Sequence, residues 1–252
     1  MTYLRKLVFF LGVGSFALLA LTTASHSGDK KNPATTPSVR LDKKGKPDAG
    51  WLKRHEGFVE IAKKGGVDVL FMGDSITDGW RGKNGKAVWD KNFAPLQAAN
   101  FGIGGDRTQH VLWRIQNGEL DGIKPKVAVL MIGTNNSGSD SAAQIAEGVT
   151  AIVKTIHEKS PTTKVLLLAV FPRGKTIPNS QNDKLIEVNK TIAKLDDGKT
   201  VKYLDIGSKF LKEGQLPKEI MPDYLHLSEA GYQIWADAIT PTLRQMLGAE
   251  KS

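Results

Sequence analysis

The chain contains five short apolar runs that alternate with longer stretches in which apolar residues recur at helical spacing. The runs are rich in strand-forming residues and lack the polar alternation of a strand that faces water on one side. Such runs are typical of strands that are buried on both faces of a parallel sheet. The five predicted strands cover residues 67–72, 98–103, 127–132, 165–171 and 201–206.

The stretches between the runs predict helices that pack on the sheet. Three of them carry apolar residues three or four positions apart, which is the spacing of one helix face. The stripes are Ile145, Val149, Ile152, Val153 and Ile156; Leu185, Val188, Ile192 and Leu195; and Ile234, Trp235, Ala238, Ile239 and Leu243. Alternating strands and helices predict a doubly wound, three-layer α/β/α sandwich with a five-stranded parallel sheet. A chain of 252 residues suits one such domain.

The first 50 residues differ in composition from the rest. Arg5 and Lys6 precede the apolar stretch 7–21, and small residues follow. Residues 1–24 are therefore expected to be a secretory signal peptide, which makes the protein secreted or periplasmic. An uncleaved N-terminal anchor is the alternative, because the apolar stretch approaches spanning length.

Residues 25–50 hold three prolines, several lysines and few large apolar residues. A stretch of this composition cannot bury enough apolar surface to fold alone, so it predicts a disordered linker. The folded domain is then expected over residues 51–252. No stable membrane span is expected once the signal is cleaved.

Charge and composition exclude several classes of protein. Much of the formal net charge of +9 falls in the first 50 residues, so the remaining domain is only mildly basic. It lacks the basic, aromatic-rich stripe of a nucleic-acid binder. With no cysteine, the protein has neither disulfides nor a cysteine-linked lipid anchor. The five histidines show no metal-ligand spacing, so we expect no metal and no cofactor.

Three glycine-led clusters directly follow the first three predicted strands, and a fourth cluster precedes the last helix. In open parallel sheets the ligand crevice lies at the carboxyl ends of the strands, so the first three are expected to meet there. The clusters are Gly73-Asp74-Ser75-Ile76-Thr77, Gly102-Ile103-Gly104-Gly105-Asp106, Gly133-Thr134-Asn135-Asn136 and Asp223-Tyr224-Leu225-His226.

Ser75 can present its hydroxyl at a strand-to-helix turn as a nucleophile, although a serine there commonly caps the helix instead. His226 follows Asp223 by three residues, so one turn can bring the imidazole and the carboxylate together. The carboxylate would then orient the ring that takes the serine proton. Taken alone, Asp223 could cap the last helix and leave His226 on the surface. The clusters together favour a triad of Ser75, His226 and Asp223.

Gly105 and Asn135 can complete this site as donors to an oxyanion. A glycine lets its backbone N–H approach the developing charge without a Cβ in the way, and an asparagine side chain adds a second donor. Asn136 could serve in place of Asn135, because spacing alone does not separate the two neighbours.

The four clusters resemble blocks I, II, III and V of the SGNH (GDSL) hydrolase superfamily, which has a flavodoxin-like three-layer fold and a Ser/His/Asp triad. Residues 100–120, 124–126, 133–136, 171–174 and 223–228 are similar to the catalytic subunits of intracellular platelet-activating factor acetylhydrolase. The resemblance implies the roles given above and adds the Ser75 N–H to the oxyanion donors. It also implies a small, acetyl-sized acyl pocket formed by Ile76, Thr134 and Leu225, and a homodimer.

Two departures from this family concern the substrate. The family members are cytosolic, whereas this chain carries the features of an export signal. Residues 76–80 also differ from the residues that follow the serine in the family. Both differences leave the alcohol part of the substrate open.

We therefore predict an exported serine esterase that hydrolyses short-chain, chiefly acetyl, carboxylic esters through an acyl-enzyme. The expected partner is a small-molecule or glycan ester, and deacetylation of a carbohydrate is the first hypothesis. An acetylhydrolase or lysophospholipase that acts on lipid esters is the alternative. A non-catalytic carbohydrate-binding module is a further alternative, disfavoured because every catalytic position is filled.

Overall fold

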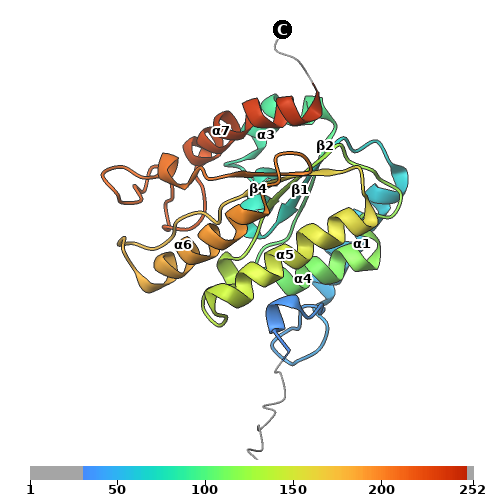
Figure 1. Cartoon of the computed structure of the whole chain (residues 1–252), viewed down its shortest axis with the longest axis horizontal. Helices are drawn as coiled ribbons and strands as arrows, with labels where there is room; N and C mark the ends of the chain where they lie inside the picture. The colour runs from blue at the N-terminus through green and yellow to red at the C-terminus, as the bar shows by residue number, and fades with distance from the viewer. Residues whose placement is uncertain (1–30, 249–252) are drawn as a thin grey trace, which may run out of the picture. The chain divides into compact units, whose positions relative to one another are not determined.

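The computed structural model describes residues 31–248, and the expected signal peptide at 1–24 lies outside them. The five apolar runs form five strands in a single parallel sheet, as predicted, with helices on both faces (Figure 1). The strands are β1 (Val69–Gly73), β2 (Ala98–Gly102), β3 (Val127–Met131), β4 (Lys164–Leu168) and β5 (Val201–Leu204). β4 and β5 end three and two residues earlier than the apolar runs that predict them, and β2 and β3 each end one residue earlier.

Seven α-helices are formed within residues 31–248. They are α1 (Ala49–Lys64), α2 (Ser75–Asp78), α3 (Lys86–Asn92), α4 (Thr108–Arg114), α5 (Ala142–Lys159), α6 (Ser180–Ile192) and α7 (Glu229–Leu247). Short helical turns lie at Pro33–Thr35, Gly79–Arg81, Ala94–Leu96, Ile115–Glu119, Thr134–Asn136, Ala193–Leu195 and Gly207–Phe210. None of the helices in this part of the chain is both long enough and apolar enough to cross a membrane.

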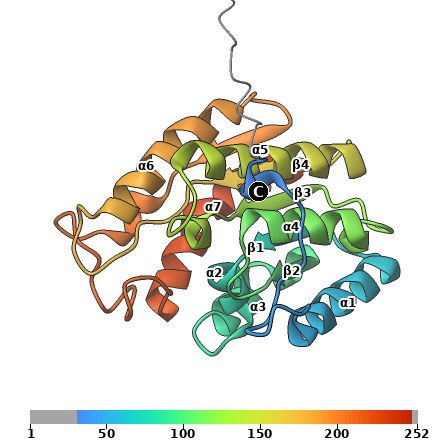
Figure 2. The same ribbon diagram turned by 90° about the horizontal axis from the view of Figure 1, so that it is seen from below.

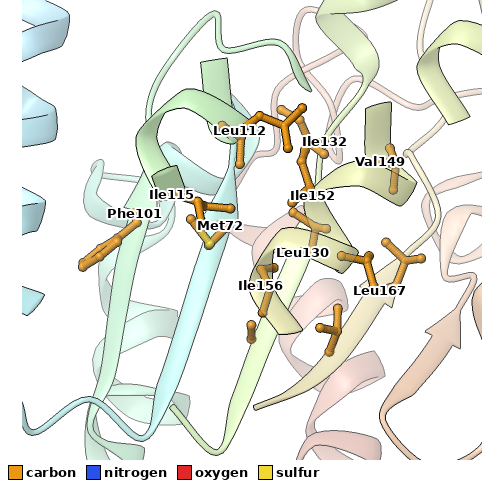
Figure 3. Packing of buried hydrophobic residues seen from close by; sticks show 14 of the residues in the cluster. Met72, Phe101, Leu112, Ile115, Leu130, Ile132, Val149, Ile152, Ile156 and Leu167 are labelled. Atoms are coloured by element: carbon orange, nitrogen blue, oxygen red, sulfur yellow. The ribbon is translucent and has the colours of Figure 1, made fainter. Parts of the chain in front are cut away.

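Alternate residues of each strand face opposite helical layers, which explains why the runs are apolar throughout. Leu70 and Met72 of β1 pack with α1, α4, α5 and α6, whereas Val69 and Phe71 pack with α3 and α7. Figure 3 shows the first of these layers, and Figure 2 shows its helices lying side by side. Each fully buried side chain of this size contributes about 1.5–3 kcal/mol, so both layers hold the sheet in place.

Polar side chains fix where the long helices begin. The Ser141 hydroxyl accepts a hydrogen bond from the Gln144 N–H, and the Gln144 side chain accepts one from the Ser141 N–H. This reciprocal pair is a capping box that starts α5. The Ser228 hydroxyl caps α7 by accepting a hydrogen bond from the Gly231 N–H, which fixes the start of this helix directly after the Asp223 to His226 cluster.

Residues 31–48 pack against the domain, so the linker prediction is wrong for this part of 25–50. Ala34 is fully buried, and its carbonyl accepts a hydrogen bond from the Thr108 hydroxyl at 2.8 Å. Asn32 donates to a main-chain carbonyl of α5. The prediction considered only whether the stretch could form its own core. It docks instead through polar contacts and one small buried residue (blue in Figure 1).

The order of the strands is β2-β1-β3-β4-β5, and all neighbours are parallel. The chain therefore reverses its direction of winding between β1 and β3. In doubly wound sheets a ligand crevice forms at this switch point, beyond the carboxyl ends of the two strands. The first and third glycine-led clusters follow these two strands.

Candidate active site

Ser75, His226 and Asp223 form a continuous chain of side-chain contacts at the switch point. The Ser75 Oγ lies 2.9 Å from the His226 Nε2, and the His226 Nδ1 lies 2.6 Å from the Asp223 Oδ2. Ser75 opens α2 directly after β1, whereas the other two residues lie in the loop before α7. The fold thus joins residues that are 151 positions apart in the sequence.

The turn that carries His226 is built by Asp223 itself. Its Oδ1 accepts hydrogen bonds from the backbone N–H groups of Leu225 and His226, while its Oδ2 contacts the imidazole. Burial opposes ionisation of this carboxyl group, but the hydrogen bonds from the ring and backbone of His226 hold the pKa of Asp223 below its usual value. An ionised carboxylate at Nδ1 favours the tautomer with its proton on that nitrogen, which leaves Nε2 free to accept the Ser75 proton.

Close packing around Gly73 fixes the turn that presents Ser75. A Cβ at Gly73 would lie 2.2 Å from the Thr77 hydroxyl and 2.4 Å from the Met131 carbonyl oxygen, so only glycine fits. Asp74 then caps α2 by accepting the Ile76 N–H at 3.0 Å. Because Asp74 supplies the cap, the Ser75 hydroxyl is not needed for it.

The loop that carries Gly105, one of the expected oxyanion donors, lies beside Ser75. A Cβ built at Gly104 would lie 3.7 Å from the Ser75 Cβ, and Gly105 has a φ of +82°, which favours glycine. The N–H groups of Ser75 and Gly105 take part in none of the hydrogen bonds found among residues 31–248. Both donors are therefore free for an oxyanion.

The structure separates the roles of the two neighbouring asparagines. Asn136 is fully buried, and its amide nitrogen donates to Thr108, Gln109 and Asp140. Asn135 is half-buried, and within residues 31–248 its amide donates to the Asp106 carbonyl alone, at 2.8 Å. Since an amide nitrogen carries two protons, Asn135 retains one for an oxyanion. This favours Asn135 over Asn136 as the donor.

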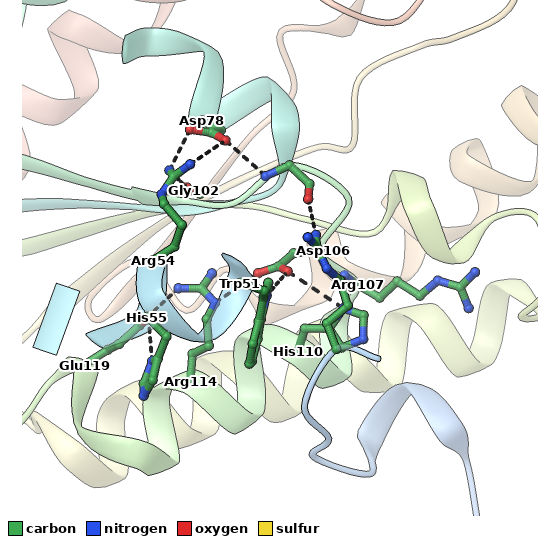
Figure 4. A network of polar contacts seen from close by, with 12 residues as sticks. Trp51, Arg54, His55, Asp78, Gly102, Asp106, Arg107, His110, Arg114 and Glu119 are labelled. Atoms are coloured by element: carbon green, nitrogen blue, oxygen red, sulfur yellow. Dashed lines mark hydrogen bonds and ion pairs between the residues drawn. The ribbon is translucent and has the colours of Figure 1, made fainter. Parts of the chain in front are cut away.

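Two ionic groups that the sequence analysis missed hold the Gly104 to Asp106 loop. Asp78 accepts the Gly104 N–H at 3.1 Å and is itself paired with Arg54 at 2.9 Å (Figure 4). Asp106 accepts the Trp51 indole N–H at 2.7 Å and the Arg114 Nε at 2.9 Å. These residues lie near the motifs, but no spacing marks them as partners.

Arg114 continues this network into the interior. It is fully buried and contacts Glu119 as well as Asp106, and Glu119 in turn lies 3.0 Å from the His55 ring (Figure 4). A buried guanidinium between two carboxylates is stable only as part of this arrangement. The Asp106 carbonyl holds Asn135, so the interior network connects directly to the site.

A cavity of about 250 Å³ lies beside Ser75 and His226. Its other lining residues are Gly79, Gly82, Lys83, Asn84, Leu227 and Tyr232. None of the three expected acyl-pocket residues lines this cavity. Ile76 and Thr134 are each 1% exposed, and the Thr134 hydroxyl accepts a hydrogen bond from Arg173 at 3.1 Å. Leu225 is half-buried. Their acyl-pocket role stays a prediction.

We expect Asp74 to make the folded state less stable as the pH rises. Burial, reinforced by the Asp106 charge, raises the pKa of Asp74 to about 7, and its Oδ2 has no partner among residues 31–248. The folded state therefore binds this proton more tightly than the unfolded state, and the stability it gives is lost as the pH rises from about 4 to about 7. Relative to the wild type, the free energy of unfolding of Asp74→Asn should rise by up to about 1.4 kcal/mol for each pH unit in that window.

Urea unfolding of both proteins between pH 4 and 8 measures this difference. Asp237→Asn serves as the control, because Asp237 is an exposed carboxylate on α7. If the difference in the free energy of unfolding between Asp74→Asn and the wild type stays constant with pH, the prediction is wrong.

The chain resembles known proteins in its sequence and in its fold. Residues 71–234 match the model of the GDSL-like Lipase/Acylhydrolase family. The chain is 38% identical over 224 residues to platelet-activating factor acetylhydrolase IB subunit alpha1 from Homo sapiens, covering 88% of this chain and 94% of the relative. The bovine (Bos taurus) subunit is 40% identical over 223 residues, covering 88% of this chain and 93% of the relative. A crystal structure of a GDSL-like lipase from Bacteroides thetaiotaomicron superposes with a TM-score of 0.63 at 18% identity, covering 77% and 97% of the two chains.

Proposed function

The chain belongs to the GDSL-like lipase/acylhydrolase family, and from this we propose that Ser75, His226 and Asp223 hydrolyse short-chain, chiefly acetyl, esters through an acyl-enzyme. Enzymes of this class are carboxylic ester hydrolases. The observation that carries the proposal is the Ser75–His226–Asp223 contact chain, with distances of 2.9 Å and 2.6 Å. These distances lie within the range needed for proton transfer between nucleophile and base.

In the proposed reaction, the Ser75 Oγ attacks the ester carbonyl carbon while the His226 Nε2 takes its proton. Asp223 stabilises the imidazolium that forms. The N–H groups of Ser75 and Gly105 and the Asn135 amide bind the oxyanion of the tetrahedral intermediate. His226 then gives the proton to the departing alcohol, and a water molecule activated by the same ring releases the acid from Ser75.

For the alcohol part, we propose a polar group such as a carbohydrate. The cavity beside Ser75 is lined in part by Lys83 and Asn84, whose side chains can form hydrogen bonds with hydroxyl groups. Its volume of about 250 Å³ lies below the usual range of about 300–1,000 Å³ for small-molecule sites. The features of residues 1–24 support export, which would give the enzyme access to glycans outside the cell.

An ester of a lipid is the second candidate. It is favoured by the names of the relatives, which are platelet-activating factor acetylhydrolase subunits that match nearly nine-tenths of this chain. The chemistry at Ser75 would be the same for both substrates, so only the alcohol differs.

A hydrolysis screen separates the two candidates. The protein is assayed on p-nitrophenyl esters of increasing acyl length, acetylated oligosaccharides and an acetyl-phospholipid. We expect acetyl to be preferred among the acyl groups, and acetylated oligosaccharides to be preferred over the phospholipid. The reverse order would favour the lipid. A folded protein that hydrolyses none of them, and whose Ser75 is not labelled by a fluorophosphonate, would be a binding module instead.

We expect Leu225→Ala to shift the acyl preference toward butyryl or longer chains, because a crowded pocket rejects extra methylenes by about 10- to 200-fold in kcat/KM. Leu225 adjoins His226, so its side chain can bound the space beside the scissile carbonyl. The chain-length profile is measured beside the melting temperature. If Leu225 is only a core residue under α7, the melting temperature will fall while the profile stays unchanged.

A further inference from the structure

Arg40 contacts the oxyanion loop from the N-terminal segment that packs on the domain. Its Nη1 donates to the Gly104 carbonyl oxygen, while its Nε and Nη2 donate to the Asp48 Oδ2 at 3.1 Å and 2.9 Å. The guanidinium thus bridges a carboxylate and one main-chain carbonyl. Because two of its nitrogens bind one carboxylate, its plane is fixed.

The Gly104 carbonyl belongs to the same peptide unit as the Gly105 N–H. We propose that Arg40 is a positioning residue that orients and polarises this peptide, so that the Gly105 N–H is aimed at the oxyanion before the substrate arrives. The inference rests on the proposed function, since it concerns one of its oxyanion donors. A charged donor on the carbonyl strengthens the hydrogen bond made by the N–H at the other end of the peptide.

The surroundings of Gly104 support a role in orientation. Its N–H is held by Asp78 and its carbonyl by Arg40, so hydrogen bonds fix both of its polar groups. A Cβ at Gly105 would lie 3.3 Å from the Arg40 Nη1, which shows how closely the guanidinium covers this peptide. Gly105 has a φ of +82°. Because a glycine has no Cβ, it can also adopt other backbone conformations unless contacts hold it in this one.

The segment that carries Arg40 is itself built to hold it in place. The Asp48 N–H donates to the Arg40 carbonyl at 2.8 Å, so the two partners of the ion pair are also joined through their backbones. Leu41 and Pro47 form an antiparallel bridge between them. Asp48 also caps α1 through the Trp51 N–H at 3.0 Å. Arg40 is therefore anchored to the same helix that supplies Trp51 to Asp106.

The test compares Arg40→Ala with the wild type on p-nitrophenyl acetate. We expect kcat to fall by about 10- to 100-fold with little change in KM, which is less than the loss on removing a donor outright. Inhibition by a boronic acid is measured in parallel, because its tetrahedral adduct on Ser75 places an oxygen in the oxyanion site. The boronate Ki should rise by the same factor as kcat/KM falls. Arg40→Lys keeps the charge but cannot span both partners, so it should fold and show a smaller loss of the same kind.

Two further variants make the outcome decisive. Asn32→Ala loosens the same segment from α5 without touching the loop, so it should lower the melting temperature and leave kcat unchanged. Asn135→Ala should lose about 100- to 1000-fold in kcat.

If Asn135→Ala loses activity but Arg40→Ala and Arg40→Lys do not, the Arg40 inference is wrong and the proposed function stands. Equal losses in Arg40→Ala and Asn32→Ala would also overturn it. Full activity in Ser75→Ala would overturn the proposed function itself.

Discussion

Ser75→Ala and His226→Ala will each lower kcat by about 10⁴- to 10⁶-fold, and the double variant will lose little more than either single variant. In the proposed mechanism the Ser75 Oγ and the His226 Nε2, which lie 2.9 Å apart, act on the same proton, so removing either abolishes the same step. The rate that remains comes from the oxyanion donors and from substrate binding. Steady-state kinetics on p-nitrophenyl acetate measure all three variants.

Asp223→Asn belongs to the same experiment and should cost less than either of these variants, because the base itself remains. The amide can still accept the backbone N–H groups that shape the turn, so the position of His226 should hold. Losses in Ser75→Ala and His226→Ala that simply multiply in the double variant would show that the two residues act independently. That result would remove the assignment of His226 as the base for Ser75.

Arg114→Met will lower the free energy of unfolding by about 3–5 kcal/mol, although Arg114 lies outside the contact chain of Ser75. Methionine fills much of the volume but leaves the buried carboxylates of Asp106 and Glu119 without their shared cation. Urea unfolding at neutral pH measures the change.

The matched control is Lys126→Met, which removes an exposed ion pair with Asp68. Exposed pairs contribute little, so this variant should unfold almost like the wild type. Equal stability of the two variants would mean that the interior network does not depend on Arg114.

The sequence predicts the layers of this fold well because burial on both faces leaves a strong local signal. Each strand contributes residues such as Leu70 and Phe71 to opposite cores, so its whole length must be apolar. The positions at which the strands end are harder to predict. Residues 169–171 are as apolar as β4 but lie beyond its last ladder pair, where the Asn189 side chain accepts the Val170 N–H. A long-range side-chain contact of this kind leaves no trace in local periodicity.

The residues of the candidate site also fall into two groups: those that a sequence motif marks and those that only a contact in the folded chain reveals. Ser75, Asp223 and His226 could be chosen from the sequence because each lies in a motif whose chemistry is incomplete without the others. Arg40 could not, because it lies in a polar stretch and its partner, Gly104, is 64 positions away. The pairing of Asp106 with Arg114 is local, at eight positions, but buried ion pairs share their residue types with ordinary surface pairs.

Asp106 has two attachments whose combination matters for how this enzyme can change. Its carboxylate is part of the ionic network in the interior, and its carbonyl holds the amide of Asn135. A substitution that loosens the network would therefore also shift Asn135, the oxyanion donor of the proposed function, so we expect variants selected for high turnover to keep these interior ion pairs. Lys83 also lines the cavity, and its side chain makes none of the hydrogen bonds or ion pairs found within residues 31–248. In directed evolution, new alcohol preferences should therefore arise there first, while the loop around Asp106 stays unchanged.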